Sequence, residues 1–253
     1  DHLKAVDVVP NIGLLLDASC SMSYNPRIAT TCSWFASRYT SNNLSMTKNQ
    51  VMRAALVGCQ SDSDGILDKW SSRVNFSLFD FGRSSTDATM RAPFGSTKAT
   101  LEAAALAVPA TGSTPLTKAI REHGRYFGQY FTNSNTLQCR PNFILLLTDG
   151  DPNGGAATFD YNCAVSGDAF QSLYVSATQP WLGSDYLTRH RDLMCSLTGE
   201  QKIRTYTLGF GAPGSYNPTN LANIASRGLG QAFYATNLTE LDASLSQMIG
   251  AMV

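Results

Sequence analysis

The sequence predicts an α/β fold: a doubly wound, mostly parallel six-stranded sheet with helices on both faces and one antiparallel edge strand. Apolar runs at residues 12–16 and 143–147 indicate the sheet, because strands buried on both faces read as continuous apolar residues. Both runs end in oxygen-bearing side chains, as expected where ligands gather at the carboxyl ends of parallel strands. Strand-like and helix-like segments then alternate, as a doubly wound sheet requires.

The composition predicts one large domain over residues 1–253, with insertions at about 23–47 and 152–202. The chain is 43% hydrophobic and only 15% charged, so it can bury a sizeable core. Nineteen basic residues balance nineteen acidic ones, which argues against a nucleic-acid-binding surface. No apolar stretch reaches the ~18 residues of a membrane span, and no charged-then-apolar leader opens the chain. We therefore expect a mature or excised piece without a membrane span.

The first strand ends at Asp17, and a polar segment with several aromatic residues follows it at 23–47. This segment is too irregular for a helix. Two interpretations stay open, namely a surface flap that covers the core and a loop that contacts a partner.

Residues 46–60 combine an apolar face with a charged face that carries Lys48 and Arg53, which predicts a helix lying on the sheet. Residues 73–81 alternate as a second strand. Residues 88–92 are expected to pair with that strand as the antiparallel edge.

Two helices are predicted at 97–108 and 115–131, and the turn between them carries Thr114 directly before Pro115, a residue suited to the first helical position. The last predicted helix packs on the sheet edge and begins with Thr239 and Asp242 in the pattern of a capping box. The remaining elements are helices at 169–177, 186–197, 221–226 and 238–252 and strands at 203–210 and 231–234.

Oxygen-bearing side chains converge on the carboxyl edge of this predicted sheet. They are Asp17, Ser19 and Ser21 after the first strand, Thr114 in its turn, and Thr148, Asp149 and Asp151 after the strand at 143–147. Hydroxyls and carboxylates without convergent His or Cys suit Mg²⁺ or Mn²⁺, and Ca²⁺ less well. Taken alone, Thr114 would be a simple helix cap. Its expected place beside Asp17 and Asp149 predicts a metal site instead.

These motifs resemble the metal-ion-dependent adhesion site of von Willebrand factor A domains. The matching segments are Asp-x-Ser-x-Ser at 17–21, Gly-Ser-Thr-Pro at 112–115 and Leu-Thr-Asp-Gly at 147–150. They come in the family's order, and the resemblance extends over nearly the whole chain. The resemblance implies direct metal contacts from Ser19, Ser21 and Thr114 and water-mediated ones from Asp17 and Asp149. It also implies that the metal binds a Glu or Asp of a partner. Cys20 stands where the family often has Gly.

A narrower resemblance is to the N-terminal domain of type IV pilus tip adhesins of the PilY kind. It depends on the long cysteine-bearing insertion after Asp17, Leu-Thr-Asp-Gly-Asp-Pro-Asn at 147–153, Tyr-Thr-Leu-Gly-Phe-Gly at 206–211 and the segment at 232–241. The resemblance implies export through the periplasm to the pilus tip or outer membrane, adhesion there, and minor pilins as partners. A propeller domain follows in that family and is absent from this chain.

The sequence does not favour an enzyme. Its three histidines are scattered, and it has neither a Gly-x-x-x-x-Gly-Lys-Ser/Thr loop nor a Gly-x-Ser-x-Gly elbow. Hydrolysis by a metal-bound water, with Asp149 or Asp151 as base, is kept as an alternative. So is a generic secreted or periplasmic A domain whose metal is structural and which scaffolds a complex. An AAA-partnered chelatase subunit is disfavoured by the cysteines.

The six cysteines lack the spacing of a zinc site, which leaves buried thiols or the disulfides of an exported protein. We favour export. Cys20 and Cys32 are expected to pair, because the first strand delivers both to its carboxyl end. Cys59 and Cys139 are expected at the opposite end of the sheet, and Cys163 and Cys195 then remain as the third pair.

Overall fold

The computed structural model describes residues 9–23, 32–39, 46–82, 88–116, 119–120, 122–124, 126–127, 140–150, 203–212 and 214–253. The predicted helices at 169–177 and 186–197 lie outside these residues, as does the insertion expected at 152–202. The strands are β1 (Asn11–Asp17), β2 (Asn75–Phe81), β3 (Ala88–Ala92), β4 (Asn142–Thr148), β5 (Ile203–Phe210) and β6 (Ala232–Ala235). The helices are the short 3-10 helix η1 (Cys20–Ser23), α1 (Ser33–Tyr39), α2 (Lys48–Val57), α3 (Ile66–Trp70), α4 (Lys98–Leu106), α8 (Pro218–Arg227) and α9 (Leu238–Gly250).

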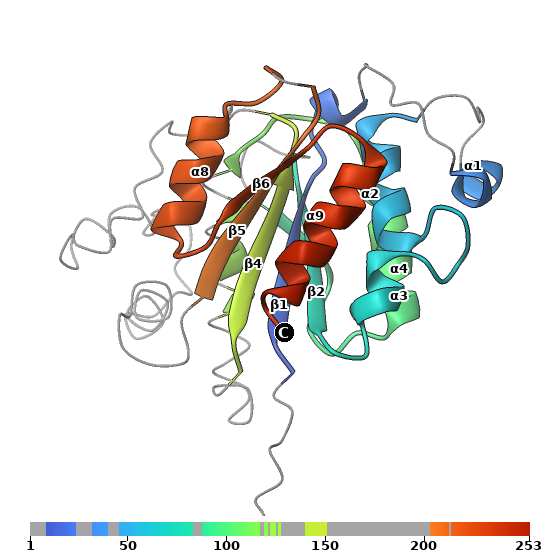
Figure 1. The fold of residues 1–253 in the computed structure, drawn as a ribbon, viewed down its shortest axis with the longest axis horizontal. Coiled ribbons are helices and arrows are strands. Elements are labelled where there is room, and N and C mark those ends of the chain that lie inside the picture. The colour runs from blue at the N-terminus through green and yellow to red at the C-terminus, as the bar shows by residue number, and fades with distance from the viewer. Residues whose placement is uncertain are drawn as a thin grey trace, which may run out of the picture.

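The six strands form one sheet in the order β3-β2-β1-β4-β5-β6 (Figure 1). Neighbouring strands are parallel except β2 and β3, which pair antiparallel at the edge. β1 lies between β2 and β4, with Asp17 opposite Phe81 and Leu16 opposite Leu147. This arrangement confirms the predicted fold class. It also brings the carboxyl ends of β1, β2 and β4 side by side.

Helices cover both faces of the sheet, because the central strands present apolar side chains on both sides. Leu14 and Leu16 of β1 belong to a core shared with α2, α3, α4 and α9. Leu15 belongs to a second core, shared with α8 and with helical residues at 116, 119–120 and 126–127. Every residue of β1 is buried. Packing on both faces therefore fixes the position of β1 and of the loop that follows Asp17.

Two short helices and one helix cap differ from the sequence predictions. The segment at 23–47, expected to lack a helix, contains α1, and α3 was not predicted. Both helices are too short for apolar periodicity to reveal them. The predicted capping box of Thr239 and Asp242 is wrong, because the N-cap of α9 lies two residues before Thr239. Asn237 is the N-cap, and its side chain accepts the Glu240 N–H at 3.0 Å.

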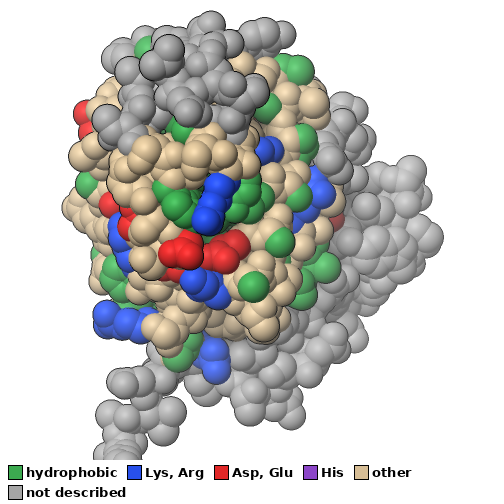
Figure 2. All heavy atoms as spheres, turned by 90° about the vertical axis from the view of Figure 1, so that its right-hand side faces the viewer, with side chains coloured by type: hydrophobic (Ala, Val, Ile, Leu, Met, Phe, Trp, Pro, Cys, Tyr) green, Lys and Arg blue, Asp and Glu red, His purple; other side chains and the backbone are tan. Residues whose placement is uncertain are grey.

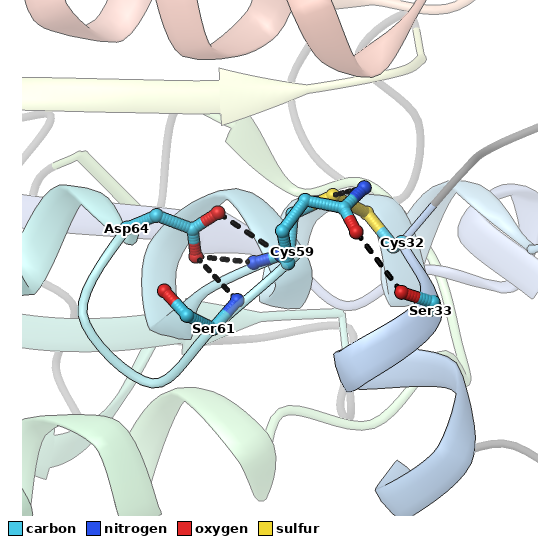
Figure 3. The surroundings of a disulfide bond; sticks show 6 residues. Cys32, Ser33, Cys59, Ser61 and Asp64 are labelled. Carbon is cyan, nitrogen blue, oxygen red and sulfur yellow. Dashed lines mark hydrogen bonds between the residues drawn. A yellow bond between two sulfur atoms is a disulfide. The ribbon is translucent and has the colours of Figure 1, made fainter.

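The predicted pairings of Cys32 and Cys59 are wrong, because the structure joins these two cysteines to each other (Figure 3). The N–H of Phe35 in α1 donates to the Cys59 carbonyl at 3.2 Å, which holds α1 against the end of α2. Asp64 secures the same turn by accepting the N–H groups of Cys59 and Gln60 at 2.8 and 2.9 Å. Burial alone would raise the pKa of Asp64, but these backbone hydrogen bonds lower it overall.

Cys20 is a free, exposed thiol beside the loop that carries Thr114. The Gly112 N–H donates to its Sγ at 3.0 Å. Cys139, Cys163 and Cys195 lie outside the described residues, so the pairing of the last two stays a prediction. None of the helices in the described part of the chain is long and apolar enough to cross a membrane.

Candidate metal centre

Three loops meet at the carboxyl edge of the sheet and are joined by backbone hydrogen bonds. Thr111 N–H donates to the Ala18 carbonyl at 2.5 Å, and Ser113 N–H donates to the Gly82 carbonyl at 3.0 Å. Gly82 has a φ of 120°, and a Cβ there would lie 2.7 Å from the Ser19 nitrogen. A glycine is therefore required after β2 so that the loop following β1 can pass close to it.

Asp17, the last residue of β1, is fully buried, and both of its carboxylate oxygens accept hydrogen bonds. The Ser19 N–H donates to Oδ1 at 2.7 Å, and the Thr148 hydroxyl donates to Oδ2 at 2.6 Å. Burial, followed by the neighbouring charge of Asp149, raises the pKa of Asp17 to about 6, although the hydrogen bonds from Ser19 and Thr148 oppose the shift. Asp17 is thus a carboxylate whose negative charge is poorly compensated.

A chain of hydrogen bonds links the two serines to the second carboxylate. The Ser21 hydroxyl donates to Asp149 Oδ1 at 2.7 Å, and this uses its only hydrogen. Ser19 must then donate in the 2.8 Å contact between the two serine Oγ atoms. Lys48 Nζ donates to Asp149 Oδ2 at 2.5 Å. Both oxygens of Asp149 are therefore occupied by donors from the protein.

Thr114 completes the group from the loop that precedes the helical residues at 116–127. Its side chain is buried, and a Cβ added at Gly150 would lie 3.4 Å from Thr114 Oγ1 and 3.6 Å from Ser21 Oγ. The two hydroxyl oxygens thus flank Gly150. Because this residue has no side chain, the space between the two hydroxyls is left open.

The structure brings all five predicted site residues together at one edge of the sheet, and Asp151 lies outside the described residues. Their donor set fits a hard divalent cation, since it combines three hydroxyl groups with two carboxylates. No cluster of three or more His, Cys, Asp or Glu side chains that could hold a metal occurs in the described ranges.

Sequence reasoning missed Lys48, which it placed on the charged outer face of a helix. The side chain is instead 5% exposed and points into the site. The available signal was its place as the first residue of a helix, where a positive charge is unfavourable.

His123 packs over β1 near Gly13 and is fully buried. A Cβ at Gly13 would come within 2.1 Å of its Nε2. The other two histidines, His2 and His190, lie outside the described residues. The described histidine therefore takes no part in the site.

The chain has the fold of von Willebrand factor A domains. It is similar to a von Willebrand factor type A protein from Catenulispora acidiphila, with 17% identity and a TM-score of 0.51 over 95% of this chain and 42% of that one. It is also similar to BatB from Bacteroides thetaiotaomicron, with 14% identity and a TM-score of 0.52 over 96% of this chain and 98% of that one. A mutant of the PilB minor pilin from Streptococcus sanguinis is 15% identical, with a TM-score of 0.57 over 99% of this chain and 62% of that one.

The chain spans less than half the length of the Catenulispora protein. No family model matches the sequence, and no curated protein matches it. At these identities the similarity concerns the fold.

Proposed function

We propose that this chain is a metal-dependent adhesion or protein-binding domain. Ser19, Ser21 and Thr114 hold Mg²⁺ or Mn²⁺ directly, and Asp17 and Asp149 act on it through water. A cation bound there supplies positive charge and an open coordination position for an acidic group of a partner. The protein is not an enzyme in this proposal.

One observation carries the proposal: each oxygen of the two buried carboxylates already accepts a hydrogen bond from the protein. Ser19 and Thr148 occupy the oxygens of Asp17, and Ser21 and Lys48 occupy those of Asp149. The serine oxygens keep lone pairs after these bonds are made. The hydroxyls are therefore the direct ligands, and the carboxylates stand behind them.

This division of roles explains why the site favours an acidic partner. Neutral hydroxyls do not cancel the charge of a cation, whereas two directly bound carboxylates would. The site also has an accessible side, since Cys20 is exposed and Ser21 is half-buried beside it. A Glu or Asp side chain that approaches from this side completes the coordination.

The setting we propose is the outside of a bacterial cell, as part of a type IV pilus-associated tip protein that contacts minor pilins. The Cys32–Cys59 disulfide supports export to an oxidising compartment. The PilB minor pilin among the structural neighbours shows that this fold occurs in pilus components. The resemblance to PilY-type adhesins supports the tip location.

The test compares two threonines of one loop in the full-length protein on piliated cells. Thr114 is buried in the site, whereas Thr111 is exposed and reaches Ala18 only through its backbone N–H. Thr114→Ala is expected to abolish attachment while the purified chain keeps its thermal unfolding temperature within a few degrees. Thr111→Ala should attach normally. Normal attachment by the Thr114→Ala cells would exclude adhesion through the metal and favour a scaffold whose metal is structural.

A further inference from the structure

Lys48 is a buried lysine in the candidate metal centre, and no motif of the site includes it. Its Nζ lies 2.5 Å from Asp149 Oδ2, with side-chain exposures of 5% and 0%. Lysines are almost never buried unless they are paired. The buried Lys48–Asp149 pair differs from the ion pairs on the outer face of α3 and α4, where acidic side chains lie beside basic ones at the surface (Figure 2). The lysine side chains of the Lys98–Asp68 and Lys69–Asp242 ion pairs are 44% and 38% exposed.

The position of Lys48 in its helix is locally unfavourable. It is the first residue of α2, directly after the N-cap Thr47, whose side chain and that of Gln50 form a capping box. A positive charge at a helix N-terminus is unfavourable, because the positive end of the helix dipole lies there. Where a local rule is broken in this way, the reason is often a functional site.

The fold also keeps space for this side chain. Gly211, which follows β5, has a φ of 140°. A Cβ at that position would lie 3.3 Å from Lys48 Cε and 3.4 Å from its Nζ. Three elements therefore place the ammonium group: α2 carries it, the end of β4 pairs with it and the turn after β5 makes room for it.

The charges of the centre give Lys48 a specific effect. Asp17 and Asp149 are both fully buried, and among the described residues Lys48 is the basic side chain paired with either of them. With Lys48 in place, the net charge of Lys48, Asp17 and Asp149 is −1 instead of −2. The three groups together therefore attract a divalent cation less strongly than the two carboxylates alone would. The ammonium group also holds the Asp149 oxygen that would otherwise be available to bind the cation directly.

We propose that Lys48 is a positioning residue that keeps Asp149 out of direct metal contact. It thereby weakens the binding of the cation and leaves it more positive toward an acidic partner. This inference rests on the metal-dependent function proposed above. An ion pair with a purely structural role would instead stabilise the fold and leave the cation affinity unchanged.

The experiment is a calorimetric titration of Mg²⁺ alone into the native chain and two variants. Lys48→Met removes the charge and keeps the length of the side chain. Lys48→Gln removes the charge but keeps a hydrogen-bond donor for Asp149. It therefore serves as the second variant if Lys48→Met does not fold. Lys69→Met, in an exposed ion pair of α3, is the matched control.

Both Lys48 variants are expected to bind Mg²⁺ roughly tenfold more tightly or better, because a unit charge close to a divalent cation is removed. Their unfolding temperature in EDTA should fall, and Mg²⁺ should restore more of it than in the native chain. The control should match the native chain in both measurements.

Unchanged or weaker Mg²⁺ binding by both Lys48 variants, with normal binding by the native chain, would overturn the inference and leave the proposed function standing. Binding by the variants but not by the native chain would support the role of Lys48 and contradict the metal-dependent function. Absence of binding in all of them would overturn both.

Discussion

The sheet buries carboxylates at two places near strand ends, and the two places treat the charge differently. On β2, Asp80 is fully buried, and its Oδ2 accepts hydrogen bonds from Nε and Nη2 of Arg91 at 2.9 and 2.6 Å. At the metal centre, Asp149 pairs with Lys48, but no basic side chain in the described residues pairs with Asp17. The first place is a compensated ion pair. The second keeps one negative charge that a bound cation would neutralise.

At neutral pH, breaking the compensated pair should have the largest effect on stability. Arg91→Met leaves Asp80 as an unpaired buried charge and should lower the free energy of unfolding by about 3 kcal/mol. Urea unfolding measures it, with Lys69→Met as the control, since breaking an exposed pair costs about 1 kcal/mol or less. The Mg²⁺ response of Arg91→Met should be unchanged. Loss of that response would show that the two carboxylate sites are not independent.

His123 tests the same idea with a buried group that has no charged partner in the described residues. It is stacked on Phe79, and burial lowers its pKa to about 3, against about 6.5 when unfolded. Because the unfolded chain binds the extra proton, stability is complete above about pH 6.5. It falls by about 1.4 kcal/mol per pH unit as the pH drops toward 3.

His123→Leu should remove this slope while leaving the slope from the carboxylates. Urea unfolding of both proteins at pH 7, 6, 5 and 4 measures the difference. Parallel stability curves for the two proteins would mean that His123 is not held neutral by burial.

Neutralising Asp17 should have a smaller effect, and in the opposite direction. In Asp17→Asn, the amide can keep partners at Ser19 N–H and Thr148 Oγ1, while the repulsion by Asp149 disappears. We expect the metal-free chain to gain about 1–2 kcal/mol. The same variant should lose the rise in unfolding temperature that Mg²⁺ gives the native chain. A metal-free variant that is less stable than the native chain would argue that Asp17 is structural, as Asp80 is.

The smallest stability effect is expected at Gly150. An added Cβ meets its neighbours at ordinary contact distances, so Gly150→Ala should change the free energy of unfolding by less than about 0.5 kcal/mol. The methyl group nevertheless enters the space between Thr114 Oγ1 and Ser21 Oγ. Mg²⁺ affinity should therefore fall roughly tenfold. Native affinity in this variant would place the cation elsewhere.

Much of the fold followed from the sequence because its strands are buried on both faces. The runs at 12–16 and 143–147 predicted β1 and β4, and both strands are buried throughout. The five side chains of the candidate site could be grouped for the same reason, because parallel strands deliver their ends to one edge. Their role toward a metal stays a prediction.

The wrong predictions share a physical cause. Each concerns a contact between segments far apart in the sequence, and the spacing of apolar and polar residues does not reveal such contacts. Cys32 was assigned to Cys20 by its expected place at one edge of the sheet, but α1 turns it toward Cys59 at the end of α2. Lys48 looked like an ordinary surface residue of an amphipathic helix. Only the position of Asp149 and the missing side chain of Gly211 show why it is buried.

The most direct test of the account is a crystal structure of the chain with Mn²⁺, located by its anomalous scattering. We expect one cation bound directly by Ser19, Ser21 and Thr114, at distances close to the ~2.0–2.1 Å of Mg²⁺. Asp17 and Asp149 should contact it through water, and Lys48 Nζ should remain on Asp149 Oδ2. A cation bound directly by either carboxylate, or no cation at this edge of the sheet, would contradict the account.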